Sequence, residues 1–413
     1  MDSLRMVMRE LGDPQDRIKS VIVGGTNGKG SVSAALAAIL GQGGSRVGLN
    51  ISPHLTSVEE RIVIDGVAVS SDDLNRAAII IRDTAKAVGT FLSFHEAITA
   101  TAYLLMHDLN CEWGVFEVGV GGRLDAANII RNPEASVIVS VGLDHQLLLG
   151  DTISKIAREK AGIMRENTPV ITGQMQPEAE KELSECALSV GARRYSYGRD
   201  YSVMLESHEI PYFRSREWGD VALAPSLVGE HQIHNMSVAI CAGRVLGSSI
   251  GNCSGGVSSV HWPARLERVS YHGREILLDC AHNVPGVEAL CHYLRSRKLF
   301  NITCIFGAIK TKEWREMATR LAPYVSRWLL LEPVSEHAVS CLELSKFLSG
   351  FDAKQEVFGG DYERLLAKVA GEKGSGGIVA TGSIYMIGGL RALIVPNDRP
   401  LWHRIPFKRT ANS

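Results

Sequence analysis

The chain has 413 residues, which is more than one hydrophobic core of ordinary size supports, so its length predicts two or three domains. Its 44 basic and 45 acidic residues give a formal net charge of −1, which argues against a nucleic-acid partner and against binding to an anionic membrane. The eight cysteines are scattered and form no Cys-x-x-Cys pair, and there is neither a secretory signal nor an apolar run of about 18 residues. We therefore expect a cytoplasmic protein with reduced thiols. We also expect a monomer.

Strand-like and helix-like segments alternate through the first half of the chain. Strands are expected at 21–25, 61–66, 113–119 and 136–142, and helices at about 30–41, 72–88, 96–109 and 151–163. Ser70 and Ser71 are candidate N-caps for the helix at 72–88, and Gly162 ends the helix at 151–163. The strands at 113–119 and 136–142 are continuous apolar runs, which is typical of a parallel sheet buried on both faces.

A second alternating series begins near residue 266. Strands are expected at 275–281, 302–308, 327–333 and 376–383, and helices at 285–297 and 312–323. The pattern is interrupted near 260–269, where Pro263 stands. We therefore predict two α/β domains with parallel sheets, covering 1–264 and 265–413.

The stretch VIVGGTNGKGS (21–31) joins a strand to a helix through a glycine-rich turn. It departs from the standard phosphate-loop pattern, because Val23 stands in place of the first glycine and Gly30 separates Lys29 from Ser31. Turned-in backbone N–H groups, the lysine and the helix N-terminus nevertheless form an anion site. The alternative is a glycine-rich turn without a ligand, but the combination favours nucleotide binding. The predicted nucleotide loop comprises Gly25, Thr26, Asn27, Gly28, Lys29, Gly30 and Ser31.

The loop sequence GTNGKGS (25–31) resembles the phosphate loop of the folylpolyglutamate synthase / dihydrofolate synthase family, a branch of the Mur ligase superfamily in which a glycine follows the lysine. Further motifs follow in the family's order: SPHLTSVEERIVIDG (52–66), EVGVGGRLDAANII (117–130), GLDHQLLLGDTISKIAREKAGI (142–163), GEHQIHN (229–235), WPARLE (262–267), LDCAHN (278–283), FGAIKTKE (306–313) and TGSIYMIG (381–388). The resemblance implies an N-terminal, phosphate-loop-containing Mur-ligase-type ATPase domain at 1–264. It also implies a C-terminal, Rossmann-like glutamate-ligase domain at 265–413.

The resemblance also implies ATP and two Mg²⁺ ions as cofactors. Ser31, Ser52, Glu117 and His145 fall on the family's magnesium positions, and oxygen ligands suit Mg²⁺. Lys160 falls on the lysine that is carbamylated by CO₂ in this superfamily, which replaces a cation with carboxylate-like oxygens. Each of these residues also has an ordinary interpretation, as a turn serine, a solvated strand end, a hydrogen-bonded histidine or a solvated helix lysine. The predicted catalytic residues are Lys29, Lys160, His145 and Arg265.

Other positions correspond to the family's nucleotide and substrate contacts. Asn235, Arg265 and Asp279 match nucleotide-contacting positions, and Arg265 would reach the γ-phosphate when the second domain closes. The alternative for Arg265 is a surface pair with Glu267. The substrate positions implied are Leu124, Asp125 and Ala126 for the pterin, and His282 and Asn283 in the ligase cleft.

The chain departs from the family's pattern at several positions. Ala264 and Cys280 replace glycines, Ala127 and Gln146 stand where threonine is common, and Thr-Lys-Glu (311–313) replaces an Asp-Lys-Asp run. Relatives also carry a stretch ahead of residues 4–20 that helps to hold pteroate. We expect either a misassigned start or weaker binding of pteroate.

The resemblance therefore predicts an ATP- and Mg²⁺-dependent ligase that adds L-glutamate to a folate, to dihydropteroate, or to both, through an acyl phosphate. Two alternatives stay open. One is a related ligase with a different carboxylate acceptor, such as a peptidoglycan precursor, which Gly30 and SPHL argue against. The other is a nucleotide-binding homologue without catalysis, which the presence of Lys29, Glu117, His145 and Lys160 argues against.

Overall fold

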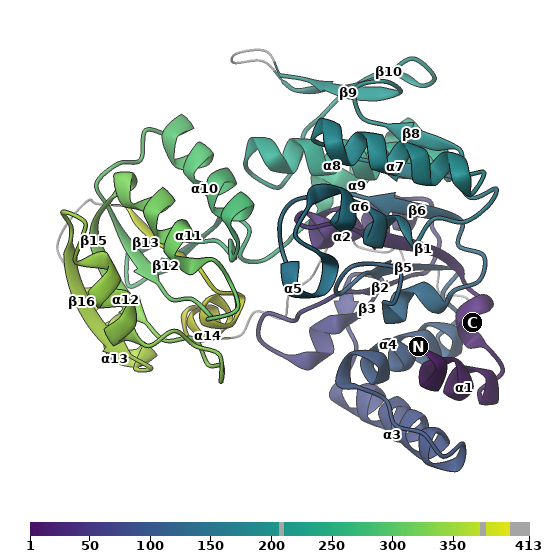
Figure 1. The fold of residues 1–413 in the computed structure, drawn as a ribbon, viewed down its shortest axis with the longest axis horizontal. Helices are drawn as coiled ribbons and strands as arrows, with labels where there is room; N and C mark the ends of the chain where they lie inside the picture. Colours follow the sequence, from purple (N-terminus) through teal and green to yellow (C-terminus); the bar gives the residue numbers. More distant parts are fainter. Residues whose placement is uncertain (206–209, 372–376, 397–413) are drawn as a thin grey trace, which may run out of the picture.

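The structure, a computed structural model, describes residues 1–205, 210–371 and 377–396. It has two α/β halves side by side, each built around its own sheet (Figure 1). The predicted fold class is confirmed. No helix in the described ranges is long and apolar enough to cross a membrane.

The N-terminal half contains an eight-stranded sheet in the order β4-β3-β2-β5-β1-β6-β7-β8. Its strands are β1 (Lys19–Gly24), β2 (Val47–Asn50), β3 (Ile62–Ile64), β4 (Val67–Ala68), β5 (Trp113–Glu117), β6 (Ala135–Ile138), β7 (Val170–Thr172) and β8 (Arg194–Ser196). Along the sheet, the six neighbouring strands β2, β5, β1, β6, β7 and β8 pair in parallel. Strand β3 is antiparallel to both of its neighbours, β2 and β4. Strands β1 and β5 are almost entirely buried, as their continuous apolar runs predicted.

Helices cover both faces of this sheet. One face is covered by α1 (Asp2–Glu10), α3 (Ser71–Ala87), α4 (Phe94–Asp108), α6 (Ile153–Ala161) and α7 (Pro177–Ser189), and the other by α2 (Lys29–Gln42), α8 (Glu230–Val245) and α9 (Ile250–Ser259). Neighbouring residues of β1 point to opposite faces, because Ile22 lies in the first core and Val21 and Val23 lie in the second. Short elements complete this half: η1 (Pro14–Asp16), η2 (Val58–Arg61), η3 (Ala126–Ile129) and α5 (Gln146–Leu149).

A three-stranded antiparallel sheet lies above this half in Figure 1 and is absent from the predicted elements. Its strands are β9 (Tyr201–Met204), β10 (Tyr212–Ser215) and β11 (Gly219–Ala222). They are short and only half buried, so they carry no continuous apolar run.

The C-terminal half contains a six-stranded sheet in the order β12-β13-β17-β14-β15-β16, parallel except for the β12–β13 pair. Its strands are β12 (Glu267–Tyr271), β13 (Arg274–Leu278), β14 (Ile302–Phe306), β15 (Val325–Leu331), β16 (Lys354–Gly359) and β17 (Ile378–Thr381). Its helices are α10 (Val284–Ser296), α11 (Trp314–Leu321), η4 (Ala322–Tyr324), α12 (Cys341–Leu348), α13 (Tyr362–Gly371) and α14 (Ile384–Ile394). The boundary at 264/265 falls in the loop between α9 and β12 and stays a prediction.

Two predicted helix ends can be compared with the structure directly. Ser70 caps α3, since its side chain accepts a hydrogen bond from the Asp73 N–H. Helix α6 begins at Ile153 rather than at 151, because Thr152 is its cap and accepts from the Lys155 N–H.

The two halves touch where α14 lies against the loop that follows β2. A Cβ atom on Gly388 would overlap the Leu55 carbonyl oxygen, so the backbones approach more closely than any side chain allows. We expect Gly388→Ala to lower the free energy of unfolding by about 1–3 kcal/mol through overpacking. Gly360→Ala is the control, since a Cβ there meets no atom within 4 Å and the change should stay within about 0.5 kcal/mol. Denaturant unfolding of both variants measures the difference, and equal stability would contradict the close approach.

Candidate active site

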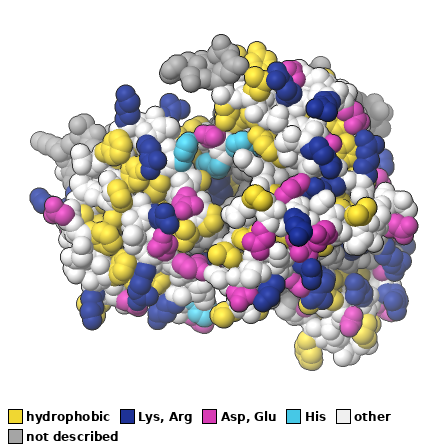
Figure 2. All heavy atoms as spheres, turned by 45° about the horizontal axis from the view of Figure 1, so that its top comes forward, with side chains coloured by type: hydrophobic (Ala, Val, Ile, Leu, Met, Phe, Trp, Pro, Cys, Tyr) yellow, Lys and Arg dark blue, Asp and Glu magenta, His cyan; other side chains and the backbone are white. Residues whose placement is uncertain are grey.

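A cleft of about 480 Å³ lies between the two halves. Figure 2 shows it as a hollow in the surface with histidine side chains at its edge. One wall includes residues at or after the ends of β1, β2, β5, β6 and β7, together with residues of α6 and α8. The other includes residues that follow β13 and the start of α14. The carboxyl ends of parallel strands in both sheets therefore face one cleft, which is where open α/β sheets bind ligands.

This cleft brings most of the predicted site residues together. Its walls include Gly25, Thr26, Asn27, Gly28, Lys29, Gly30, Ser31, Ser52, Glu117, His145, Lys160, Asn235, Arg265, Asp279 and His282. Leu124, Asp125, Ala126 and Asn283 are not among the wall residues.

Two glycines of the phosphate loop are explained by their neighbours. Gly28 has a φ of 82°, and a Cβ there would overlap the Asn235 side chain, which packs directly on the loop. A Cβ on Gly30 would lie 2.5 Å from the Trp262 ring. The glycine that separates Lys29 from Ser31 is therefore required by the packing of Trp262, a residue more than 200 positions away.

Lys29 lies folded over its own loop. Its Nζ donates to the carbonyl oxygens of Gly25 (3.0 Å) and Thr26 (3.2 Å). Burial lowers its pKa, and the negative charge of Glu117 opposes that effect.

Glu117, at the end of β5, is only 5% exposed, and its carboxylate accepts the Ser52 N–H at 3.1 Å. Burial raises the pKa of Glu117, because it disfavours the charged carboxylate. A cation bound next to Glu117 would stabilise that charge.

Lys160 lies in the last turn of α6 and is 3% exposed. Among the residues that the structure describes, no acidic side chain lies within the 4.0 Å ion-pair distance of its Nζ. Burial, with a further contribution from the charge of Lys29, lowers the pKa of Lys160 to about 7. A buried lysine without a counter-ion is not the solvated helix lysine of the ordinary interpretation.

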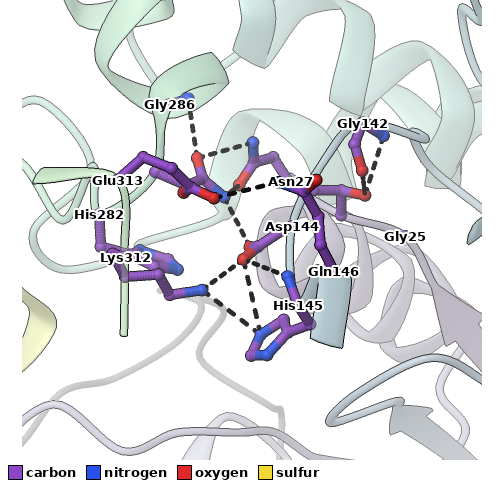
Figure 3. A network of polar contacts seen from close by, with 12 residues as sticks. Gly25, Asn27, Gly142, Asp144, His145, Gln146, His282, Gly286, Lys312 and Glu313 are labelled. Carbon is purple, nitrogen blue, oxygen red and sulfur yellow. Dashed lines mark hydrogen bonds and ion pairs between the residues drawn. The ribbon is translucent and has the colours of Figure 1, made fainter. Parts of the chain in front are cut away.

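A polar network joins the two halves beside the phosphate loop (Figure 3). Lys312 Nζ lies 2.5 Å from Asp144 Oδ1 and 3.4 Å from His145 Nε2. Asn283 donates to Asp144 Oδ2 (2.9 Å) and exchanges amide hydrogen bonds with Asn27 (3.0 and 3.1 Å). The Asp144 and Lys312 side chains are 9% and 7% exposed. Burial by itself would raise the pKa of Asp144, but the Lys312 charge and the hydrogen bonds from Lys312 and Asn283 together outweigh burial and hold that pKa well below its usual range.

Arg265 does not form the surface pair with Glu267 that was its alternative interpretation. The Glu267 carboxylate accepts instead from Arg391, at 2.9 Å to each oxygen, and from the Ala264 N–H at 2.7 Å. Arg265 lines the cleft, where its Nη1 donates to the Ala264 carbonyl oxygen at 3.2 Å.

Two further residues of the second half face the cleft. Both carboxylate oxygens of Asp279 accept backbone N–H groups (3.0 and 2.9 Å), and burial raises its pKa against the opposing charge of Arg265. His282 Nδ1 lies 2.8 Å from the Cys280 carbonyl oxygen, a contact that fixes the proton on Nδ1 and leaves Nε2 as an acceptor. Burial and the Lys312 charge lower the pKa of His282 to about 4, so its imidazole is neutral near pH 7.

The comparisons with known proteins agree with this geometry. Residues 23–243 match the Mur ligase middle domain, and residues 264–383 match the Mur ligase glutamate ligase domain. The chain belongs to the Mur ligase family.

It is 32% identical to the folylpolyglutamate synthase of Lacticaseibacillus casei, over 94% of this chain and 93% of that protein. It is 31% identical to the dihydrofolate synthase/folylpolyglutamate synthase of Bacillus subtilis, again over 94% and 93%. A solved structure of Escherichia coli FolC in complex with DHPP and ADP matches it with a TM-score of 0.86 and 25% identity, over 95% of this chain and 92% of that one. These similarities confirm the predicted family, fold and ligase class of this Mur ligase.

The segment predicted to contact a pterin has a structural role that the sequence did not indicate. Leu124 is 65% exposed, and Ala126 is buried in the core. Asp125 caps η3, accepts the N–H groups of Gly119 and Val120, and lies 3.2 Å from His95 Nε2. Its pterin role stays a prediction.

Asp144 and Lys312 are not among the predicted site residues, although both lie in the motifs GLDHQLLLGDTISKIAREKAGI and FGAIKTKE. One feature of the sequence could have indicated Lys312: the run Thr-Lys-Glu (311–313) keeps the central lysine of the family's Asp-Lys-Asp run. Glu313 of the same run accepts from Gln146 Nε2 at 3.2 Å, which adds a further contact between the two halves of this Mur ligase. Ala264 has a φ of 56°, in the region that favours glycine, and this explains the glycine that relatives carry there.

Proposed function

We propose that this Mur ligase is an ATP- and Mg²⁺-dependent enzyme that joins L-glutamate to the carboxylate of a folate, of dihydropteroate, or of both. The observation that carries the proposal is the single cleft in which the phosphate loop faces Arg265 and His282 of the second half. The substrate's carboxylate oxygen would attack the γ-phosphorus of ATP, releasing ADP and forming an acyl phosphate. The amine of L-glutamate would then attack the acyl carbon, phosphate would leave, and an amide would form.

The residues present fit magnesium. Buried Glu117 is a carboxylate that a cation would stabilise, and Ser31 and Ser52 can supply hydroxyl oxygens. His145 can supply a neutral imidazole, because burial and the Lys312 charge lower its pKa. Within the described ranges no three His, Cys, Asp or Glu side chains form a metal cluster, so this set depends on hydroxyl groups and on ATP oxygens. Mg²⁺ would neutralise the negative charge that develops on the transferred phosphate.

We propose that Lys160 is carbamylated. The neutral amine is the form that reacts with CO₂, and the reaction forms an N–C bond and releases one proton. Burial without a counter-ion favours that neutral form, and the product would place an anion near Lys29 and the two serines. A free ammonium at the same place would instead repel Mg²⁺.

In the second half, we propose that Arg265 contacts the γ-phosphate and that His282 positions L-glutamate. A guanidinium at the domain junction reaches the phosphate only when the halves are close, which links the reaction to domain closure. The Nε2 of His282 can accept a proton or a hydrogen bond from the glutamate amine, because Nδ1 is engaged with the backbone. Asn235 and Asp279 complete the nucleotide side of the cleft in this proposal.

The test is phosphate release from ATP and Mg²⁺ with L-glutamate and either tetrahydrofolate or dihydropteroate. Release should require both co-substrates, and the two acceptors tested separately distinguish polyglutamylation from dihydrofolate synthesis. Release that does not depend on L-glutamate would contradict the proposal. A peptidoglycan precursor in the acceptor panel tests the related ligase activity.

A further inference from the structure

A second cavity, of about 340 Å³, lies among α1, η1, η3 and the segment after α6. Figure 1 shows α1 at the end of the N-terminal half that is remote from the C-terminal half, so this cavity is separate from the interdomain cleft. Four of its wall residues are arginines: Arg5, Arg9, Arg131 and Arg165. The chain as a whole carries a net charge of −1, so this gathering of cations does not reflect a generally basic surface.

One of the four arginines is neutralised by its neighbours. Arg131 lies 2.8 Å from Asp13 and 3.4 Å from Asp16. Arg5 has only an exposed contact with Asp2, at 3.6 Å, and such a pair is weak in water.

The other two arginines have no carboxylate partner in the part of the chain that the structure describes. Arg165 is half buried and donates to three backbone carbonyl oxygens and to Asn128 Oδ1 (2.6 Å). Arg9 forms no ion pair in the described ranges. Arg165 also lies close enough to Arg5 for the two positive charges to oppose each other, and an anion between them would remove that repulsion.

We propose that this cavity is a binding site for a small polyanion that carries at least two carboxylate or phosphate groups. Guanidinium groups bind both kinds of oxyanion through paired N–H donors, and the volume is that of a small-molecule site. The site is independent of the proposed ligase reaction, because none of its wall residues belongs to the predicted ATP, metal or substrate set.

Two probes distinguish the sources of this chemistry: tripolyphosphate for phosphates and γ-linked triglutamate for carboxylates. We would measure binding by calorimetry to the full chain with ADP and Mg²⁺ in excess, so that the phosphate loop does not take up the probe. Arg5→Gln together with Arg9→Gln removes two exposed cations from the wall without disturbing a buried contact. Arg76→Gln with Arg82→Gln on α3 is the control with the same change in charge, since both side chains are exposed and lie outside the cavity.

At least one probe should bind the unmodified chain at about 50 mM salt and bind less tightly at about 500 mM. The Arg5/Arg9 variant should weaken that binding about tenfold or more, and the control should change it less than about twofold. The proposal is overturned if neither probe binds, or if the Arg5/Arg9 variant binds as tightly as the control. The probe that binds more tightly identifies the phosphate or the carboxylate class.

Discussion

Replacing Lys160 by alanine is expected to lower glutamate-dependent turnover at least about a thousand-fold. In the proposed mechanism this side chain, once carbamylated, supplies oxygens next to the phosphate that is transferred. Loss of a group that stabilises charge in a dry site raises the barrier by several kcal/mol, and each 1.4 kcal/mol corresponds to about a factor of ten in rate. Lys160 is 3% exposed, so no solvent shell replaces what the substitution removes. Phosphate release under saturating ATP, Mg²⁺ and both co-substrates measures the effect.

Lys155 provides the matched control on the same helix. Its side chain is 63% exposed and pairs with Asp151 at 2.8 Å, so Lys155→Ala should leave turnover within about twofold. Carbon NMR with ¹³C-labelled bicarbonate tests the carbamate without relying on activity. The carbamate signal should be present in the unmodified chain and in Lys155→Ala, and absent from Lys160→Ala. Unchanged turnover in Lys160→Ala would place the chemistry elsewhere.

Replacing Lys312 by methionine is expected to lower turnover by a factor of about 10² to 10³. The substitution keeps the side-chain volume but leaves the Asp144 carboxylate buried without its partner. Removing one member of a buried pair costs about 3–5 kcal/mol, and here that cost weakens a contact between the two halves. The form in which the two halves are in contact would then be less populated. Because residues of both halves line the cleft, turnover would fall with that population. Turnover and small-angle scattering together distinguish a loss of closure from a loss of folding.

A double substitution tests whether the two residues act as a pair. Asp144→Asn keeps an acceptor for Asn283 but removes the charge, so Lys312→Met combined with Asp144→Asn should recover part of the loss. Simple addition of the two single losses would show that Lys312 and Asp144 act independently.

The same pair sets a dependence of stability on pH. Because the folded-state pKa of Asp144 is depressed, its contribution to stability is fully present above the pKa of a free aspartate, about 4. It is lost only as the pH falls through the lower, folded-state pKa. Acid unfolding of Asp144→Asn should therefore start from a lower stability near neutral pH and show a shallower decline below about pH 4.

Much of the fold could be predicted because local patterns determine it. The apolar runs that became β1 and β5 are buried on both faces, and such strands have almost no other stable environment. Ser70 was identified as a candidate cap because a serine before an amphipathic helix satisfies an N–H group that is otherwise unpaired. The small sheet β9–β11 was not predicted, because short and half-exposed strands carry no such pattern.

The residues of the candidate site also differ in whether the sequence alone could have placed them together. Residues 25–31 and Glu117 could be placed together from sequence, since the loop follows one buried parallel strand, Glu117 ends another, and the carboxyl ends of such strands share one edge. The pairing of Asp144 with Lys312 could not be predicted, because 168 positions separate the two residues and no periodicity relates them.

The sequence by itself therefore determined the two α/β units, the phosphate loop and, through ordered motifs, the ligase family. These depend on local propensity and on short motifs, which act over a few residues. Only the tertiary structure decided why Gly30 interrupts the loop, which charges close the cleft, and that four arginines meet away from it. Each of these depends on side chains brought together by the packing of distant segments, and the free energy of such contacts is not encoded in any one stretch of the chain.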